Sequence, residues 1–326
     1  MKASAYAPGK IILIGEHFVV YGKPAIVMAI NIGVKVIAEK RADCIVHISS
    51  NLGFFGKYKN QKFESESMEL NSRKHLEPVK IASETVLKEL DKRCGLNIEI
   101  HSDLPIAVGL GSSGALAVST VAAIGKLLGA NFSEKEIIKL SFEAEKYVHL
   151  HPSGIDQAVS TYGGVIVFDR NRGVSRLNIE TGIPIVIGNT GIQRNTGMLV
   201  KSVRIKKDMF ANVINSLIHT GGQLTSEAID VLKKGNLKQF GELMDINHGL
   251  LTALGVSNDA LDRLVNSAKK SGALGAKLTG AGGGGCMVAL STSDNRKKIA
   301  NAIRLAGGTP ILAEKTEVGV KTWLNH

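Results

Sequence analysis

Apolar residues early in the chain are patterned as in strands, and further on they recur with the spacing of helices. Three stretches rich in β-branched residues, 10–17, 25–40 and 43–50, predict strands. Between 78 and 94 the apolar positions follow one helical face with Gly95 as the expected end, and the next seven residues alternate like a strand. Further helices are predicted over 112–129 and 133–150. The first half is therefore expected to contain a sheet with helices.

The second half has a βαβ pattern. Another helix is predicted with Ser257 as its cap, an acidic first turn, a basic last turn and Gly272 at its end. The remaining predicted elements are strands over 183–189, 286–290 and 310–323 and a helix over 295–308. The best place to divide the chain lies near 170–184. We predict an α/β (α+β) protein with two domains, 1–175 and 176–326.

Composition is typical of a globular protein. The 326 residues, 44% of them hydrophobic, are sufficient for two domains that each have a core. The most apolar stretch is interrupted by Asn31 and Lys35, and the first residues show no signal pattern, so we expect a cytoplasmic protein with no membrane partner. Cys44, Cys94 and Cys286 lie far apart without C-x-x-C spacing, which argues against disulfides and a zinc site and predicts ordinary buried thiols.

The net charge of +11 is compatible with a nucleic-acid partner, an anionic substrate or a lysine-rich solvated surface. The densest basic run, 201–207, is short, contains no aromatic residue and is followed at once by Asp208. A nucleic-acid site is expected to have a longer basic stripe. We therefore favour the solvated surface and predict no nucleic-acid partner.

Residues 109–114 read G-L-G-S-S-G, which satisfies the G-x-G-x-x-G pattern of dinucleotide-binding proteins. The context differs, because several residues separate the preceding strand from Gly109 and the required acidic residue does not end a following strand. No Walker A motif is present either. Two interpretations stay open: an anion site at a helix N-terminus with a hydroxyl for Mg²⁺, or a plain glycine turn with a serine cap.

Two further segments change this balance. The stretch 8–17 reads PGKIILIGEH, and KLTGAGGGGC at 277–286 has five glycines in six positions, which suggests close backbone approach. Together with GLGSS at 109–113, these segments resemble the three ordered motifs of the GHMP kinase superfamily. The resemblance implies an α/β two-domain GHMP kinase fold, with an N-terminal ribosomal-protein-S5-like domain and a C-terminal ferredoxin-like βαβ domain.

The segment HPSGIDQAVSTYGG at 151–164 is similar to a run found in the mevalonate kinases of this superfamily. The resemblance implies that Asp156 is the general base, that Lys10 is its cationic neighbour, and that Glu145 and Ser113 bind Mg²⁺. A carboxylate and a lysine are the groups that a poorly nucleophilic alcohol needs for attack on a phosphoryl group. The implied ATP phosphate-binding loop is formed by Gly109, Leu110, Gly111, Ser112, Ser113 and Gly114.

Other positions follow from the same resemblance. Glu16, His17 and Arg194 are expected to contact the acceptor together with Lys10 and Asp156. The implied glycine-rich third motif comprises Thr279, Gly280, Ala281, Gly282, Gly283 and Gly284. No role is assigned to His149 or His151.

The chain also departs from the family pattern. Ala107 stands where a glycine is usual and is followed by Val108, which restricts positive φ angles in the loop. Phe18 replaces a small residue, and the segment 189–197 lacks an acid, a serine and a lysine of the family run. These departures bear on the acceptor more than on kinase activity.

We predict ATP- and Mg²⁺-dependent phosphorylation of mevalonate, a small anionic alcohol, on its C5 hydroxyl to give 5-phosphomevalonate and ADP. Another GHMP acceptor such as phosphomevalonate is the first alternative. A basic nucleic-acid-binding protein is the alternative from another class, but it would not need Lys10, Glu145 and Asp156 beside three glycine motifs. A homodimer is left open.

Overall fold

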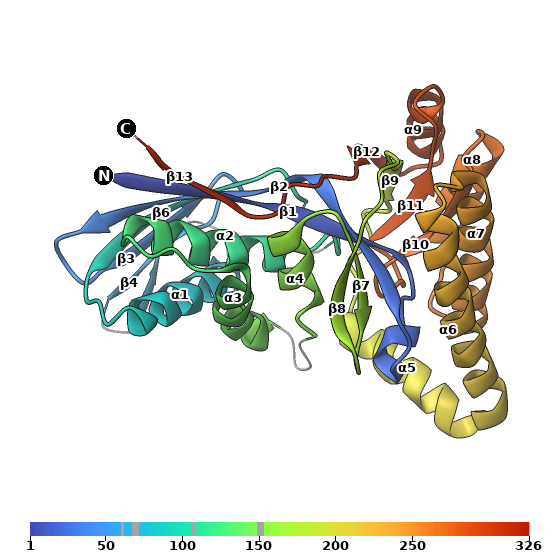
Figure 1. Cartoon of the computed structure of the whole chain (residues 1–326), viewed down its shortest axis with the longest axis horizontal. Coiled ribbons are helices and arrows are strands. Elements are labelled where there is room, and N and C mark those ends of the chain that lie inside the picture. Colours follow the sequence, from blue (N-terminus) through green and yellow to red (C-terminus); the bar gives the residue numbers. More distant parts are fainter. Residues whose placement is uncertain (60–61, 67–71, 106–107, 149–152, 326) are drawn as a thin grey trace.

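The chain folds into two lobes, each built on its own sheet (Figure 1). The computed structural model describes residues 1–59, 62–66, 72–105, 108–148 and 153–325. The first sheet has nine strands in the order β13-β1-β2-β6-β3-β4-β5, and β7 and β8 extend it from the first residues of β2. Its strands are β1 (Lys2–Ile14), β2 (Ala25–Arg41), β3 (Val46–Ser50), β4 (Phe55–Lys59), β5 (Lys62–Ser65), β6 (Gly95–Ser102), β7 (Val165–Asp169), β8 (Gly173–Leu177) and β13 (Lys321–Asn325).

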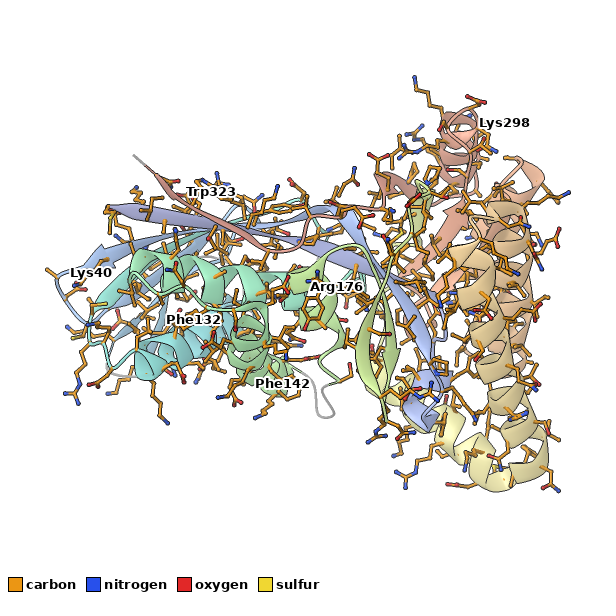
Figure 2. All side chains as sticks on the ribbon, viewed as in Figure 1. Lys40, Phe132, Phe142, Arg176, Lys298 and Trp323 are labelled. Carbon is orange, nitrogen blue, oxygen red and sulfur yellow. The ribbon has the colours of Figure 1, made fainter. Side chains whose placement is uncertain are left out.

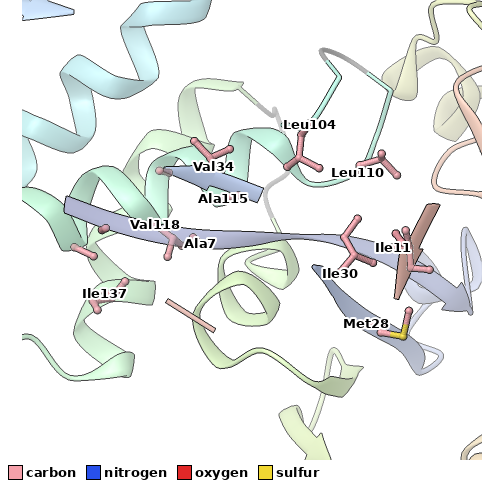
Figure 3. Close-up of a cluster of buried hydrophobic side chains, with 14 of the residues drawn as sticks. Ala7, Ile11, Met28, Ile30, Val34, Leu104, Leu110, Ala115, Val118 and Ile137 are labelled. Atoms are coloured by element: carbon pink, nitrogen blue, oxygen red, sulfur yellow. The ribbon is translucent and has the colours of Figure 1, made fainter. Parts of the chain in front are cut away.

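Helices cover one face of this sheet (Figure 1). The helices are α1 (Ser72–Glu89), α2 (Ser112–Leu127), α3 (Glu134–Val148) and α4 (Ile155–Tyr162), and a 3₁₀ turn, η1 (Phe18–Tyr21), follows β1. Figure 3 shows part of this core: Ile11 of β1 and its strand partner Met28 of β2 lie toward one end, whereas Val118 of α2 lies further along β1, near Ala7. Burial of these alternate strand positions against apolar helix faces is what the sequence pattern predicts.

The second lobe contains a four-stranded antiparallel sheet in the order β10-β11-β9-β12. Its strands are β9 (Pro184–Asn189), β10 (Gly275–Thr279), β11 (Cys286–Leu290) and β12 (Thr309–Glu314). Its helices are α5 (Thr196–Met209), α6 (Ala211–Lys233), α7 (Leu237–Ala253), α8 (Asp259–Lys270) and α9 (Arg296–Leu305). This order, with helices between β9 and β10 and between β11 and β12, is the ferredoxin-like arrangement, as expected.

The chain ends return to each other. Strand β13 pairs antiparallel with β1, with Lys2 opposite Asn325. The last strand, β13, thus belongs to the first sheet. The predicted division after residue 175 falls within β8. The domain bounds stay a prediction. Among the described residues, no helix is long and apolar enough to cross a membrane.

One predicted helix has different ends. Helix α1 begins at Ser72 and includes Pro78, which was expected at its start. It stops at Glu89 because Asp91 adopts a left-handed conformation with φ 50°, and the expected terminator Gly95 is instead the first residue of β6. The sequence did not distinguish these two roles of Gly95, because a glycine that ends a helix and a glycine that allows close contact in a strand look alike in sequence.

Three smaller expectations were wrong. The cap of α8 is Asn258, whose side chain accepts from the Leu261 N–H, whereas Ser257 donates to Asp262. The predicted strand 310–323 is two strands, β12 and β13, which belong to different sheets. Of the three cysteines, only Cys286 is buried, and Cys44 is exposed because it lies in a bend outside any strand.

Phe18 joins the lobes by packing. It is fully buried in the core of the second lobe, although it follows directly from the first sheet. Gly221 of α6 provides the room, since a Cβ there would lie 2.4 Å from the Phe18 ring. The departure from a small residue at position 18 is thus matched by a glycine on the facing helix.

This pairing predicts opposite effects for two glycine substitutions within helices. Gly221→Ala should lower the free energy of unfolding by about 1–3 kcal/mol, because a rigid ring must move in a packed core. Gly249→Ala in α7, where the added methyl meets nothing within 4 Å, should raise it by about 0.5–1 kcal/mol. Urea unfolding of both variants checks this. Equal changes of the same sign would contradict the packing argument.

Candidate active site

A largely buried ion pair marks the centre of the candidate site. Nζ of Lys10, on β1, lies 3.0 Å from Oδ1 of Asp156, in the first turn of α4, and the two side chains are 9% and 20% exposed. The Lys10 N–H donates to the Leu110 carbonyl at 2.8 Å, which fixes the strand against the glycine loop. Glycine is required on the facing segment, because a Cβ at Gly111 would lie 2.5 Å from Lys10 Cγ and one at Gly114 would lie 2.6 Å from Asp156 Cβ.

The glycine loop ends in a free helix N-terminus. Gly111 is the N-cap of α2 in a left-handed conformation with φ 76°, and as a glycine it has no side chain to cap the helix. Ser112 and Ser113 therefore lie in the first turn with hydroxyls that do not serve as a cap, so the serine-cap interpretation is wrong. Unpaired amides and the helix dipole at such an end favour an anion.

The departure from the family pattern at Val108 does not disturb the backbone of the glycine loop. Positive φ angles occur at Gly109 and Gly111, and Val108 does not adopt one. Ala107 lies outside the described residues, as do His149 and His151. At the described positions, each left-handed angle in the loop is at a glycine.

Glu145 of α3 lies beside the ion pair and is 6% exposed. Burial, and then the negative charge of Asp156, raise its pKa to about 7, against hydrogen bonds from the Gly154 backbone and the Gln157 side chain. Its Oε2 is buried and has no hydrogen-bond partner among the described residues. An unpaired, buried carboxylate oxygen that carries a full charge only above neutral pH is suited to a cation.

The donor set fits Mg²⁺. No group of three acidic, histidine or cysteine side chains that could hold a metal occurs among the described residues. Mg²⁺ does not need such a cage, because it commonly binds one or two carboxylates, waters and substrate phosphates. Glu145 with the Ser113 hydroxyl would supply the protein ligands next to an anion at the α2 N-terminus.

Arg194 bridges two glycine motifs. Its guanidinium lies where a Cβ on Gly109 or on Gly280 would be, 2.2 and 2.3 Å from guanidinium nitrogens. One of those nitrogens, Nη1, is buried with no hydrogen-bond partner, and within the described part of the chain the side chain forms no ion pair. Burial lowers the pKa of Arg194, while Cys286 and Asp156 oppose this shift. A buried guanidinium with unused donors is suited to an anionic ligand.

The third glycine motif contacts backbone. The Thr279 hydroxyl donates to the Ile12 carbonyl at 2.9 Å and accepts from the Ile12 N–H at 3.2 Å, which joins β10 to β1. The Gly283 N–H donates to the Val256 carbonyl at 2.8 Å.

Gly285 continues this backbone packing. Its N–H donates to the Ile192 carbonyl at 2.9 Å, and its carbonyl accepts from the Thr190 N–H at 2.9 Å. Gly284 has a φ of 140°, and a Cβ there would lie 2.7 Å from the Ile192 carbonyl oxygen. The third motif therefore places the loop that carries Arg194.

Two expected acceptor contacts have other partners. The Glu16 carboxylate accepts from Lys277 Nζ and, at 3.1 Å, from Asn247 Nδ2. His17, with a φ of 61°, bonds the Ala281 carbonyl through Nε2 at 2.8 Å, and burial lowers its pKa. Contact of Glu16 and His17 with a substrate stays a prediction.

Lys277 and Asn247 were missed by the sequence analysis. Lys277 is fully buried, and burial lowers its pKa against the opposing effect of Glu16. The signal that could have found it is a single lysine in an otherwise apolar strand, since an unpaired charge is rarely buried.

Comparisons with known proteins agree with this geometry. The chain matches the models of the GHMP kinases N terminal domain over 77–164 and of the GHMP kinases C terminal domain over 228–308. It is 40% identical over 331 residues to the mevalonate kinase of Pyrococcus furiosus, covering 98% of both chains. The chain belongs to the mevalonate kinase family of the GHMP kinases.

Relatives of the kinase include solved structures. It superposes on the L. major mevalonate kinase in complex with R-mevalonate with a TM-score of 0.83, at 27% identity and 96% coverage of each chain. The Methanococcus jannaschii mevalonate kinase gives a TM-score of 0.82 at 25% identity, with 97% and 98% covered. These matches confirm the predicted family and fold, whereas the roles of single residues stay predictions.

The raised pKa of Glu145 predicts a pH-dependent stability. The folded protein holds this proton more tightly than an unfolded chain, whose glutamate pKa is near 4.5, so stability should fall as pH rises from about 4.5 to about 7. Glu145→Gln should remove this loss. At pH 8 its free energy of unfolding in urea should exceed that of the wild type by roughly 1–3 kcal/mol, whereas at pH 4.5 the two should differ little.

The matched control is Glu143→Gln on the same helix, where an exposed carboxylate pairs with Lys146 and its removal should change little. A gain from Glu145→Gln that is equal at both pH values would contradict the proton-linked origin.

Proposed function

We propose that this kinase transfers the terminal phosphoryl group of ATP to the C5 hydroxyl of mevalonate, giving 5-phosphomevalonate and ADP. The observation that carries the proposal is the buried Lys10–Asp156 pair beside a free helix N-terminus, in a chain 40% identical to a mevalonate kinase over nearly its whole length. This is a transferase of isoprenoid precursor synthesis.

Asp156 is proposed as the general base. Its carboxylate takes the hydroxyl proton while the C5 oxygen forms a bond to the γ-phosphorus, and the bond from that phosphorus to the β–γ bridging oxygen breaks to release ADP. Lys10, 3.0 Å from the carboxylate, is placed to stabilise charge that develops on the attacking oxygen. An alcohol needs this help because it is a weak nucleophile at neutral pH.

The phosphates of ATP are proposed to bind at the α2 N-terminus, where the glycine loop 109–114 presents backbone N–H groups. Glu145 and Ser113 would hold Mg²⁺ there, and the ion would neutralise phosphate charge during transfer. Arg194, with an unused buried donor, is proposed to bind the anionic end of the acceptor. A coupled ADP-release assay with mevalonate, phosphomevalonate, homoserine and galactose tests the acceptor.

A cytoplasmic location and the absence of a nucleic-acid partner are further parts of the proposal, and a homodimer is left open. Charged side chains are spread over both lobes, with Lys40 and Lys298 at opposite ends of the molecule (Figure 2). Within the densest basic run, Lys206 donates to the Leu254 carbonyl at the end of α7, and Lys207 lies 6.0 Å from the Tyr21 ring centroid. Part of this basic run therefore has internal partners.

Substitution of the base tests the catalytic assignment. Asp156→Asn should reduce kcat by about 10²–10⁴-fold, because the acceptor proton has no base, while Mg·ATP affinity stays within a few-fold. Steady-state kinetics and nucleotide titration of the folded variant provide the measurement. The exposed Asp208→Asn serves as the control and should keep wild-type turnover. Near-normal kcat in Asp156→Asn would remove Asp156 from the mechanism.

Ligand-induced stabilisation distinguishes a kinase from a nucleic-acid binder. Mg·ATP should raise Tm at physiological salt, because a ligand bound only by the folded state stabilises it. Single-stranded RNA should give no shift, since nonspecific phosphate contacts weaken steeply with salt. Thermal denaturation with each ligand is the measurement. Stabilisation by RNA together with no effect of millimolar Mg·ATP would overturn the kinase assignment.

A further inference from the structure

The four residues that follow β1, 15–18, are held by the second lobe. Phe18 is buried in its core, the His17 ring bonds the Ala281 carbonyl, and Glu16 contacts Lys277 and Asn247. These partners come from α7, β10 and the third glycine motif, and Figure 1 shows β1 running out of the first sheet toward them. Glu16 and His17 were expected to contact substrate. The side chains of Glu16, His17 and Phe18 instead all contact residues of the second lobe.

The charged contact within this segment is completely removed from solvent. Side-chain exposure is 0% for Lys277 and 1% for Glu16. Lys277 donates both to the Glu16 carboxylate and to the Leu278 carbonyl, and Asn247 donates to the second carboxylate oxygen. Both charges are therefore compensated, and each carboxylate oxygen accepts a hydrogen bond from the second lobe.

Stability alone does not account for such a pair. Two charges lose their hydration on burial, and apolar residues of similar size often replace a buried ion pair without loss of stability. A buried pair does fix geometry, because moving either partner leaves an uncompensated charge in the interior. The pair is therefore best explained by what it keeps in place.

The Glu16–Lys277 pair fixes the position of the third glycine motif relative to β1. Glu16 follows Lys10 by six residues on the same strand and turn, and Lys277 precedes Gly280, which Arg194 contacts, by three residues. The Thr279 hydroxyl binds Ile12 between these points. The Lys10–Asp156 pair belongs to the first lobe, and Arg194 depends on the third motif of the second.

We propose that Glu16 and Lys277 are positioning residues, which act without touching substrate by holding the Arg194 loop in register with Lys10 and Asp156 across the two lobes. The inference rests on the proposed function for its kinetic consequence. Its structural consequence, a fixed distance between β1 and the third motif, does not depend on the identity of the acceptor.

The test compares Lys277→Met with the double variant Glu16→Gln and Lys277→Met. The single variant leaves the Glu16 charge unpaired and should show a lower Tm, whereas the double variant, with no charge left, should melt within about 5 °C of the wild type. Although stable, the double variant should have a kcat about 10- to 100-fold lower, because misplaced groups lose alignment. Its KM for Mg·ATP should stay within about threefold, since the α2 N-terminus is untouched.

Amide hydrogen exchange provides a readout that is independent of turnover. In the double variant the Thr190, Gly283 and Gly285 amides, which join the third motif to its neighbours, should exchange faster. The matched control is Leu264→Ala, a buried α8 residue whose side chain lies against Gly308, outside the motif, and this variant should lower Tm without changing kcat or these amides.

The outcomes separate cleanly. A stable double variant with wild-type kcat and unchanged amide exchange overturns the positioning role. If Leu264→Ala loses as much kcat as the double variant, the loss is due to lower global stability, and the positioning role is again overturned. If the wild type does not phosphorylate mevalonate, the proposed function fails, and the exchange of the three amides alone decides whether the pair positions the third motif.

Discussion

Strand β1 makes contacts with both lobes, and the site depends on this shared strand. It pairs with β2 and β13 in the first sheet, and both backbone groups of Ile12 bind the Thr279 hydroxyl of the second lobe. Lys10 lies two residues before Ile12 and faces Asp156. Any shift of the second lobe relative to β1 would therefore change the surroundings of the reactive pair. In most two-lobed proteins an interface of polar contacts allows motion, whereas here a buried charge and a buried ring cross it.

The two carboxylates of the site have different environments, and this difference matches the separate roles proposed for them. Asp156 forms an ion pair with the Lys10 ammonium at 3.0 Å. Glu145 is more deeply buried, and the Asp156 charge adds to the burial effect that raises its pKa to about 7. Near neutral pH, Glu145 therefore carries a full negative charge only when a cation compensates it. Carboxylates in unlike environments can serve two tasks in one site.

Glycine gives the site its close packing. Lys10, Asp156, Arg194 and the Val256 carbonyl each approach a glycine so closely that a methyl group would collide with them. Flexible residues cost conformational entropy on folding, and the chain concentrates that cost where side chains or backbone must nearly touch the loops. The same logic explains Gly221, which admits the Phe18 ring. Because the N-cap of α2 is Gly111, no side chain of that residue covers the helix N-terminus, which can accept an anion.

Several features were determined by the sequence alone. Periodic apolar positions identified most strands and helices, and three spaced glycine motifs with Lys10, Glu145 and Asp156 indicated the kinase family, because local conformation and phosphate binding depend on neighbouring residues. Tertiary structure alone decided the rest. The pairing of β13 with β1, the contact between Arg194 and two glycine loops, and the burial of Glu16 against Lys277 join residues far apart in the chain. A charged residue in a motif looks the same whether it faces substrate or another side chain, since its partner is chosen only when the lobes pack together.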